Sequence, residues 1–376
     1  MRLLLILLHV YVGWRLLGGL HTGPAGAAAA AAVVVALTLS VIGVPLAFRA
    51  RRMRSRGLAD AITWVGMIAG SLFSSLLVLT FLRDVILLVV RLAAPSGLSQ
   101  LTGASAATVV VLALAATLVG LINARRRARI VEVDVPLPNL PAALHGFSIA
   151  QISDVHVGPT IKRGYVDAIV DAVNELEADL IAVTGDLVDG SVAHLREETR
   201  PLARLAAREG TFFVTGNHEY YSGAHEWTRE LRELGINVLM NEHVVLRRGD
   251  AALVIAGVTD YSAHHHDPAQ RSDPAAALLG APVDAAARIL LAHQPMTAPA
   301  AAAAGFDLQI SGHTHGGQFW PWTWVVRYYQ PFTAGLHSLN RLLVYVSRGT
   351  GYWGPPTRLG APSEITRLRL VTTAPV

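Results

Sequence analysis

The chain has 376 residues, of which 52% are hydrophobic and only 15% charged, and its formal net charge at pH 7 is +4. The charged fraction is low for a soluble protein, and the length is sufficient for a catalytic domain and a second region. Cysteine is absent, which excludes disulfide bonds and thiolate metal ligands. Part of the positive charge comes from arginine clusters beside apolar segments, a pattern that favours a membrane over nucleic acid as the partner.

Residues 1–124 are predicted to form a membrane region of about four helices. Each of four apolar segments has about the 20 residues that a helix needs to cross the hydrocarbon core. The segments are Leu3–Leu20, Ala27–Phe48, Ala59–Leu82 and Ser105–Asn123. The short apolar run Val85–Val90 follows the third segment and is either a tilted extension of it or a re-entrant piece. A buried core helix is the alternative for any one segment, but four in succession with few charges favour the membrane.

The distribution of arginines predicts the side on which the C-terminal domain lies. Nine arginines lie in two clusters, whereas the loops at 21–25 and 95–103 contain neither lysine nor arginine. The nine are Arg49, Arg51, Arg52, Arg54, Arg56, Arg125, Arg126, Arg127 and Arg129. The positive-inside rule then places these clusters, both termini and the catalytic domain on the cytoplasmic face of the inner membrane. A signal peptide ending among the small residues near Ala25 is an alternative for the first segment, and it leaves the side of the domain unchanged.

A linker with a first strand is expected at 125–145, and a catalytic domain at 146–376. The residues Val131–Val135 alternate as a strand does, and the three prolines between positions 136 and 141 are expected to end that strand. Apolar residues recur at helical spacing in three later segments. These are Tyr165–Leu176, Leu202–Ala207 and Trp227–Leu234.

The C-terminal domain contains five apolar runs that resemble buried strands, and each is followed closely by acids, amides or imidazoles. The runs are 147–152, 181–184, 211–216, 289–292 and 308–312. Strands that alternate with helices indicate βαβ units, in which ligands bind beyond the carboxyl ends of the strands. Three later runs, at 252–256, 342–346 and 365–371, are expected to be strands of a second sheet.

Five motif blocks follow the five runs. In chain order they are D-x-H, G-D-x-x-D, G-N-H-E, an isolated histidine and G-H-T-H-G-G-Q. Together they resemble the calcineurin-like metallophosphoesterases over about residues 130–371, and the last block with Ser347–Gly351 resembles most the YkuE-like bacterial, membrane-anchored branch. The resemblance implies an α/β fold in which the multi-span α-helical membrane region precedes a two-sheet αββα sandwich. Five blocks in order are far more specific than any one of them.

The resemblance also implies a centre of two divalent metal ions. Asp154, His156, Asp186 and His315 would hold one ion, and Asp186, Asn217, His293 and His313 the other. The chemistry agrees, because a two-metal phosphoesterase needs hard oxygen and imidazole ligands with one of them bridging. Asp154 and His156 are two positions apart, as are His313 and His315, so an extended chain would point both members of a pair the same way. These ligand types suit Mn²⁺, Fe or Zn²⁺.

His218 is the expected catalytic residue. In the family the matching histidine stabilises the transition state or protonates the leaving group, and the ordinary imidazole pKa of about 6.5 suits that work. Glu219 is expected either to orient His218 or to face solvent, and Asp189 either to steer an imidazole or to cap a helix. Arg348 is the preferred contact for a substrate phosphate, ahead of Arg358.

Two features lie outside this site. The run His264–His266 is either a further metal site or, as we favour, a solvated loop. The aromatic residues of Phe319–Trp324 and Tyr328–Tyr329 form either the core of a packed loop or a surface that enters the membrane interface, where Trp and Tyr are favoured. The sequence leaves the second choice open.

The sequence favours a membrane-anchored, two-metal phosphoesterase that cleaves a phosphodiester or pyrophosphate by attack of metal-bound hydroxide. The resemblance and the anchor together suggest a lipid-linked substrate, with the lipid bilayer as partner and no role for nucleic acid. One alternative is a nucleotide phosphodiesterase whose membrane region is only a tether. Another is a catalytically inactive membrane sensor, which the presence of every ligand-type residue argues against.

Overall fold

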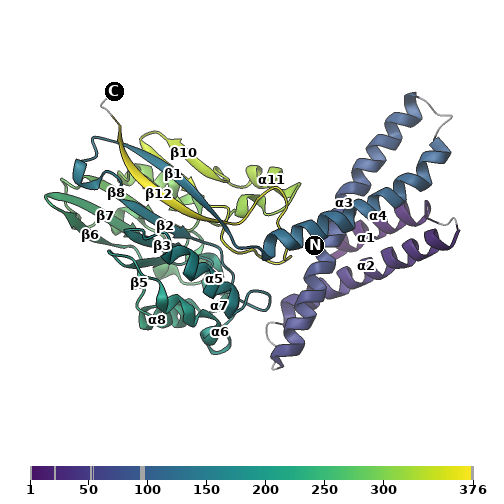
Figure 1. Cartoon of the computed structure of the whole chain (residues 1–376), viewed down its shortest axis with the longest axis horizontal. Helices are drawn as coiled ribbons and strands as arrows, with labels where there is room; N and C mark the ends of the chain where they lie inside the picture. Colours follow the sequence, from purple (N-terminus) through teal and green to yellow (C-terminus); the bar gives the residue numbers. More distant parts are fainter. Residues whose placement is uncertain (1, 21–22, 51–52, 54, 94–97, 374–376) are drawn as a thin grey trace. The chain divides into compact units, whose positions relative to one another are not determined.

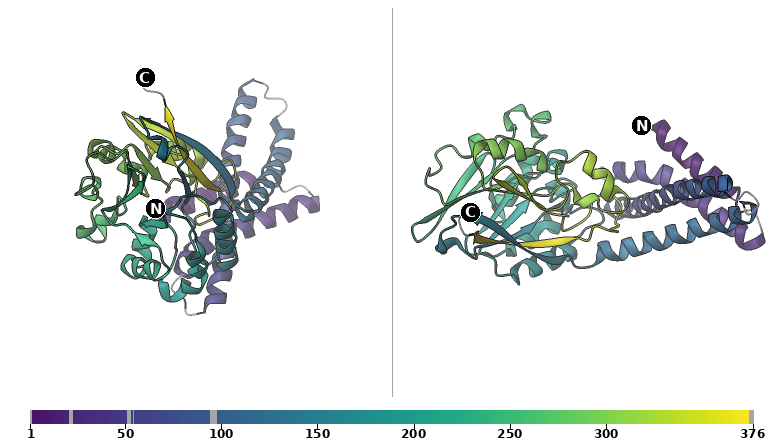
Figure 2. Two further views of the ribbon diagram at one scale, coloured as in Figure 1. Left: turned by 60° about the vertical axis from the view of Figure 1, so that its left-hand side comes forward. Right: turned by 90° about the horizontal axis from the view of Figure 1, so that it is seen from above.

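The computed structural model describes residues 2–20, 23–50, 53, 55–93 and 98–373. The chain divides into two compact units, whose elements Figures 1 and 2 trace. The helical unit comprises Met1–Arg125 and Gly354–Leu359, and the sheet unit comprises Arg126–Trp353 and Gly360–Val376. Parts of the orientation argument lie outside the described residues. These parts are Arg51, Arg52, Arg54, residues 21–22 and residues 94–97.

The helical unit contains four long helices. They are α1 (Arg2–Leu17), α2 (Gly23–Ala50), α3 (Arg56–Ala93) and α4 (Leu98–Arg125). Within the described residues, three segments are long and apolar enough to cross a membrane, namely Pro24–Ala50, Arg56–Ala93 and Leu101–Arg125. Helix α1 has 16 residues, fewer than the about 20 of a full crossing, so the first predicted span stays a prediction. The run Val85–Val90 is an extension of α3, which is continuous over 38 residues.

Polar side chains inside the helical unit are paired with one another. The guanidinium of Arg15 on α1 donates two hydrogen bonds to Asp84 on α3, at 2.8 and 2.9 Å, and the Tyr11 hydroxyl donates a third at 2.7 Å. Arg83 donates to the Ser105 hydroxyl and the Thr102 carbonyl on α4, both at 2.8 Å. Ionisable groups on apolar helices are tolerated when they pair in this way, which explains why Arg15 fits an otherwise apolar helix.

A short segment from far along the chain, Gly354–Leu359, groups with these helices. The Arg358 amide donates to the Gly120 carbonyl at 2.9 Å, and the Asn123 side chain donates to the Arg358 carbonyl at 3.2 Å. The Ser71 hydroxyl donates to the Thr357 hydroxyl at 3.1 Å. The helical unit is therefore built from two stretches of sequence.

The sheet unit is the predicted sandwich of two six-stranded sheets. The first has the order β1 (Arg129–Pro138), β12 (Glu364–Thr373), β2 (Ser148–Ile152), β3 (Leu180–Thr184), β4 (Thr211–Val214) and β5 (Asn237–Val238). The second has the order β10 (Gly335–Leu339), β11 (Leu342–Val346), β9 (Leu308–Ser311), β8 (Ala287–Leu291), β7 (Ala251–Gly257) and β6 (Glu242–Arg248). Apolar side chains of both sheets form one buried core, which includes Ile149 and Phe212 from the first and Leu253 and Ile289 from the second.

Helices surround the sandwich. The α-helices are α5 (Arg163–Asn174), α6 (Val192–Thr199), α7 (Asn217–Ser222), α8 (Ala224–Glu233), α9 (Pro274–Ala277), α10 (Ala298–Ala304) and α11 (Trp322–Val325). The 3₁₀ helices are η2 (Ala142–Leu144), η3 (Arg200–Arg204), η4 (Ala263–His265), η5 (Pro268–Gln270), η6 (Pro295–Thr297), η7 (His315–Gly317) and η8 (Val326–Tyr328). Ala277 of α9 and Ala298 of α10 pack with Val254 and Leu290 on the second face of the second sheet. The predicted α/β class and αββα layering are thereby confirmed.

Three sequence-based expectations about elements are wrong. The run 365–371 is a strand of the first sheet, where β12 lies parallel to β1 and antiparallel to β2. The prolines do not end β1 at Val135, because the strand continues to Pro138. It can do so because β1 is an edge strand, and an edge tolerates residues without an amide hydrogen. The predicted helix Leu202–Ala207 is instead the 3₁₀ turn η3, with Pro201 in its first turn.

Candidate metal centre

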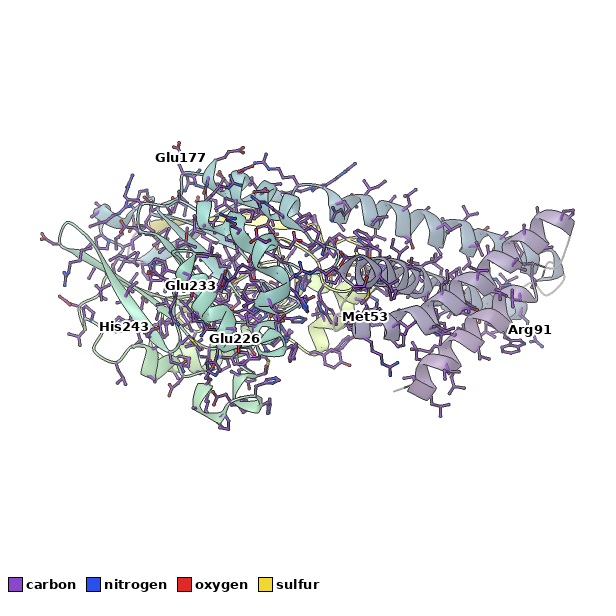
Figure 3. All side chains as sticks on the ribbon, turned by 90° about the horizontal axis from the view of Figure 1, so that it is seen from below. Met53, Arg91, Glu177, Glu226, Glu233 and His243 are labelled. Carbon is purple, nitrogen blue, oxygen red and sulfur yellow. The ribbon has the colours of Figure 1, made fainter. Side chains whose placement is uncertain are left out.

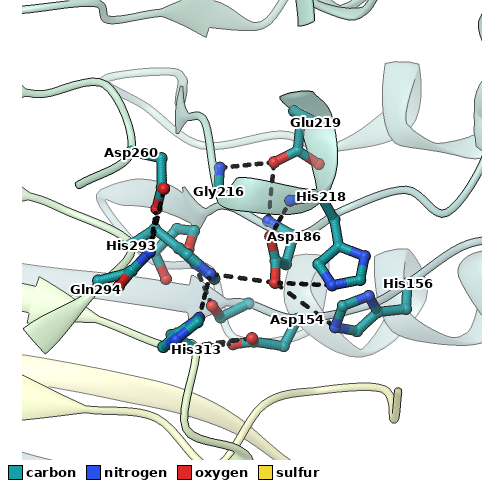
Figure 4. A network of polar contacts seen from close by, with 12 residues as sticks. Asp154, His156, Asp186, Gly216, His218, Glu219, Asp260, His293, Gln294 and His313 are labelled. Carbon is teal, nitrogen blue, oxygen red and sulfur yellow. Dashed lines mark hydrogen bonds and ion pairs between the residues drawn. The ribbon is translucent and has the colours of Figure 1, made fainter. Parts of the chain in front are cut away.

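The candidate ligands meet at one edge of the sandwich, beyond the carboxyl ends of parallel strands. Strands β2, β3 and β4 run parallel, as do β8 and β9. Asp154, Asp186 and Asn217 follow the first three strands, and His293 and His313 follow the other two. Figure 4 shows the side chains of Asp154, Asp186, His293 and His313 turned toward one another, although they come from different sheets. This arrangement agrees with the expectation that ligand-binding side chains lie beyond the carboxyl ends of the strands.

One cluster consists of Asp154, His156 and His315, which are buried and close enough to hold one ion. The Nε2 atoms of His156 and His315 face each other at 3.1 Å, and Asp154 Oδ1 lies 3.4 Å from His315 Nε2. Two imidazole nitrogens at this distance repel unless a proton or a cation lies between them. Two imidazoles and a carboxylate form a donor set that suits a divalent transition metal.

A second cluster consists of Asp186, His293 and His313. His293 Nε2 lies 3.1 Å from Asp186 Oδ2 and 3.2 Å from His313 Nδ1. The other nitrogen of His293, Nδ1, lies 2.8 Å from the Thr184 carbonyl and donates to it, so Nε2 is the nitrogen that faces the cluster. This tautomer is the one that a metal ligand needs.

Asn217, which directly follows Gly216, has a buried oxygen that is unpaired in the part of the chain that the structure describes. Its side-chain oxygen Oδ1 is buried and accepts no hydrogen bond within the described residues. A buried polar atom without a partner costs about 1–3 kcal/mol, so such atoms are rare unless another ligand satisfies them. The residues present therefore fit a metal site at this edge.

Asp186 lies between the two clusters. Its Oδ2 atom is 3.1 Å from His293 Nε2 on one side and 3.9 Å from His156 Nε2 on the other. Its Oδ1 atom accepts a hydrogen bond from the His218 amide at 2.9 Å. Burial alone would raise the pKa of Asp186, but the neighbouring imidazoles of His293 and His218 outweigh it and hold the pKa well below the ordinary value.

The backbone that presents these ligands is not the extended chain that the i and i+2 spacing suggested. Five candidate ligands have left-handed φ angles: Asp154 (54°), His156 (55°), Asp186 (50°), His313 (73°) and His315 (50°). A residue other than glycine in this region costs on the order of 1–3 kcal/mol, and such strain collects at functional sites. The members of each pair are therefore presented by left-handed backbone and not by an extended strand.

Two glycines allow the backbone to approach the carboxylates. A Cβ atom at Gly312 would lie 2.2 Å from Asp154 Oδ2, and one at Gly216 would lie 2.2 Å from Asp186 Oδ1. Any side chain at either position would therefore displace a candidate ligand. This steric limit explains why the motif blocks have glycine at these two positions.

Glu219 neither orients His218 nor faces solvent. Its buried carboxylate accepts hydrogen bonds from the amides of Asp186 (2.9 Å), Leu187 (2.8 Å) and Gly216 (2.6 Å). Burial, followed by the charge of Asp186, raises the pKa of Glu219 to about 8. Glu219 thus holds the turn that carries Asp186 against the start of α7.

His218 contacts Asp189 through its Nδ1 atom, and its Nε2 atom lies 3.9 Å from Asp186 Oδ2. Asp189 also lies 3.6 Å from His156 Nδ1, so it steers imidazoles and is not a helix cap. Burial opposes a positive charge on His218, yet the carboxylates of Asp186 and Asp189 outweigh it and raise the pKa of His218 to about 9. His218 is therefore held between two carboxylates.

Two aromatic rings that sequence reasoning missed flank His218. The ring centroids of Tyr221 and Trp353 lie 5.2 and 5.6 Å from that of His218. The backbone of Trp353 is held by the Gln318 side chain through hydrogen bonds of 2.9 and 3.0 Å. Tyr221 is close in sequence to the G-N-H-E block, but no local signal connects Trp353 with it.

Asp260 is a further missed residue. It is fully buried after β7, and both of its carboxylate oxygens accept hydrogen bonds from Gln294, at 3.0 and 3.1 Å. Gln294 directly follows His293, as Figure 4 shows. The only sequence signal was an acid just after an apolar run, which also describes many turn residues.

The remaining candidates have different fates. Arg348 is one-third exposed, lies against Gly316 and forms an ion pair of 2.8 Å with Glu364. Arg358, the second candidate for a phosphate contact, is 1% exposed and belongs to the helical unit. The histidines of the run His264–His266 are in none of the potential metal groups found among the described residues.

Comparison with known proteins agrees with this fold and site. The family described as calcineurin-like phosphoesterase matches residues 147–317. A Danio rerio protein named "Transmembrane protein with metallophosphoesterase domain" is 38% identical, over 72% of this chain and 64% of its own length. An Aquifex aeolicus protein named "Uncharacterized metallophosphoesterase" is 32% identical, over 63% of this chain and 89% of its own length. The Bacillus subtilis metallophosphoesterase YkuE is 29% identical, over 62% of this chain and 82% of its own length.

The chain belongs to the calcineurin-like metallophosphoesterase family, as the five motif blocks predicted. Its relatives include proteins named as transmembrane, in agreement with the three apolar helices. The chain spans 64% of the length of the Danio rerio relative, less than two thirds.

Proposed function

We propose that the protein is a membrane-anchored phosphoesterase with two metal ions, which hydrolyses a phosphodiester or a pyrophosphate. The observation that carries the proposal is the position of Asp186, whose single oxygen Oδ2 faces a cluster of potential ligands on each side. A carboxylate placed in this way is suited to bridge two cations.

The two clusters and Asn217 support the following assignment of the metal ligands. Asp154, His156, Asp186 and His315 would hold one, and Asp186, Asn217, His293 and His313 the other. When bound, a pair of divalent ions neutralises phosphoryl charge and lowers the pKa of water, which supplies a nucleophile near neutral pH. The residue types agree with Mn²⁺, Fe or Zn²⁺.

His218 would act on the leaving group. Its Nδ1 atom is bound to Asp189, which leaves Nε2 to carry the proton toward the reacting phosphate. The Asp189 carboxylate at Nδ1 favours the protonated imidazole, which can stabilise developing charge or donate its proton. Arg348, held by Glu364 beside the turn after His315, would contact a phosphate oxygen.

The membrane setting motivates two finer proposals. The arginine clusters favour a cytoplasmic position of the sheet unit at the inner membrane. The three apolar helices keep the enzyme beside lipid, which favours a lipid-linked substrate. A periplasm-dependent phosphatase fused after Val376 should be silent and a cytoplasm-dependent fluorescent protein bright; the reverse pattern would contradict the orientation.

The central experiment measures metal content and turnover together. Purified full-length protein should contain two metal equivalents and cleave a chromogenic phosphodiester. Chelation should remove both properties, and added Mn²⁺ or Zn²⁺ should restore them. Turnover that survives complete removal of metal would contradict the proposal.

One observation favours a second candidate function, a nucleotide phosphodiesterase. Aromatic rings stack on nucleobases, and those of Tyr221 and Trp353 flank His218 and are partly exposed. Comparing kcat/KM for a nucleotide diester with that for a lipid-linked pyrophosphate discriminates between the two functions. A preference for the nucleotide that is lost in Trp353→Leu would favour the second.

A further inference from the structure

The aromatic residues that follow the last motif block form a surface and not the core of a packed loop. We call residues 322–329, which comprise α11, η8 and Tyr329, the aromatic segment. Trp322, Trp324, Tyr328 and Tyr329 are 42%, 62%, 87% and 77% exposed. Among the described residues of the sheet unit, ten large hydrophobic side chains are exposed, and four of them lie within these eight residues. Exposure of this density marks an interaction surface.

The segment is structured, so its exposure is not that of a loose loop. The Trp322 amide donates to the Phe319 carbonyl at 2.9 Å, and the Tyr329 amide donates to the Val326 carbonyl at 3.1 Å. Just before the segment, Phe319 pairs with Gly360 in an isolated bridge. The exposed rings are therefore presented from short, hydrogen-bonded turns.

The chemistry of the side chains indicates a lipid headgroup region as the occupant. All four exposed rings are Trp or Tyr, which combine an apolar body with one polar group and are favoured at the membrane–water interface. If the segment bound the apolar surface of another protein or an acyl chain, Leu or Phe would serve equally well. The segment contains neither residue. The protein itself carries three helices fit to cross a membrane, so lipid is present at high local concentration.

The charge around the segment fits an anionic lipid surface. Residues 308–363 contain no Asp or Glu but four arginines. Arg327 lies inside the segment, and both it and Arg341 are exposed. Arg348 instead forms an ion pair with Glu364, and Arg358 is buried in the helical unit. Acidic side chains of the sheet unit lie on other elements, such as Glu226 and Glu233 on α8, labelled in Figure 3. Basic residues close to an anionic leaflet are attracted to its surface.

The segment is also joined tightly to the candidate metal centre. Gly317, two residues after His315, has a φ of 80° and packs so closely that a Cβ atom there would lie 2.3 Å from Thr323 Cα. Movement of the segment would therefore be transmitted to the turn that carries His315.

From these observations we propose that the aromatic segment docks the sheet unit on the headgroup region of an anionic bilayer. The contact is made by Trp322, Trp324, Tyr328 and Tyr329 with Arg327 among them. It holds the turn of His315 beside the lipid surface. The proposal concerns binding alone and does not depend on whether the centre hydrolyses phosphoesters.

The absence of cysteine allows a direct test, because a single introduced cysteine can be labelled without background. Trp324→Cys and Tyr328→Cys would each be labelled with a fluorophore in the full chain, in nanodiscs of phosphatidylcholine with phosphatidylglycerol. Val283→Cys is the matched control, because Val283 is 92% exposed in the sheet unit and lies outside the acid-free stretch. Thermal unfolding of each labelled variant confirms that it is folded.

The labels at Trp324 and Tyr328 should be quenched several-fold more than the Val283 label by a headgroup-attached nitroxide lipid. They should be quenched less than that label by aqueous iodide. Equal lipid quenching at all three positions would overturn the proposal. Protection from iodide without lipid quenching would overturn it too, because protein would then cover the segment. Lipid quenching that is unchanged in phosphatidylcholine alone would overturn the role assigned to charge.

Discussion

The carboxylates at the two ends of the first sheet have different kinds of partner. At the amino end of β3, Asp179 accepts hydrogen bonds from the Ser148 amide at 2.8 Å and from the guanidinium groups of Arg248 and Arg208 at 2.6 and 3.2 Å. At the carboxyl end, Asp154 and Asp186 meet imidazoles and backbone amides, and within the described residues neither forms an ion pair with an arginine or a lysine. The protein neutralises one end by itself and leaves the other to cations.

This difference shows that an acid beside a strand cannot be assigned as structural or as a metal ligand until its partners are known. Burial would raise the pKa of Asp179, but the Ser148 amide and Arg248 outweigh this effect and lower that pKa. The charge of Asp179 is therefore already compensated by protein groups. The carboxyl end instead brings imidazole nitrogens within 3.1 and 3.2 Å of each other. Such crowding of donors is stable when metal ions replace protons among them.

The largest effect should come from removing the residue between the two clusters. Asp186→Ala should abolish phosphoesterase activity and lower the metal content, because both proposed ions lose a shared ligand. Metal analysis of the purified protein with a turnover assay measures this. Asp179→Ala, at the other end of the same strand, is the matched control and should keep its metal. Full metal occupancy in Asp186→Ala would show that Asp186 is not the bridge.

An intermediate effect is expected at His218, which touches the centre without belonging to either proposed ligand set. His218→Ala should retain both metals, while activity falls by roughly 10²–10⁴-fold, the usual contribution of a general acid. The loss should be smaller for diesters with good leaving groups, since these need no protonation. Equal losses in kcat on good and poor leaving groups would instead assign His218 to charge stabilisation.

The smallest effect on chemistry, and a clear effect on stability, is expected at Asp179. Asp179→Asn should leave activity unchanged and lower the free energy of unfolding by about 1.5–3 kcal/mol at neutral pH, the range for hydrogen bonds to a charged group. Because the folded-state pKa is below the ordinary 3.8, this stability is present above that value and is lost as the pH falls through the folded-state pKa.

Denaturant unfolding of the full chain in detergent, at a series of pH values, measures this difference. The curves of the wild type and Asp179→Asn should converge under acid conditions. Asp250→Asn is the control, because Asp250 is exposed and a surface change usually stays within about 0.5 kcal/mol. A difference that persists at acid pH would mean that Asp179 acts through packing and not through its charge.

The sequence by itself determined the class of this protein and the residue types of its centre. Apolar runs followed by D-x-H, G-D-x-x-D, G-N-H-E and G-H-T-H-G-G-Q predicted the family and the sandwich, both of which are confirmed. Long apolar segments predicted the helices, because the length needed to cross a bilayer is a property of the chain itself. The roles of the individual ligands stay predictions.

Only the tertiary structure decided how these parts meet. Periodicity reports which face of a strand is buried and not which strand lies beside it, so β12 was expected in the wrong sheet. The left-handed turns at Asp154 and His313 depend on close contacts such as that of Gly312 with Asp154, which come from a distant strand. Trp353 reaches His218 for the same reason, since contacts between residues far apart in sequence exist only once the chain has folded.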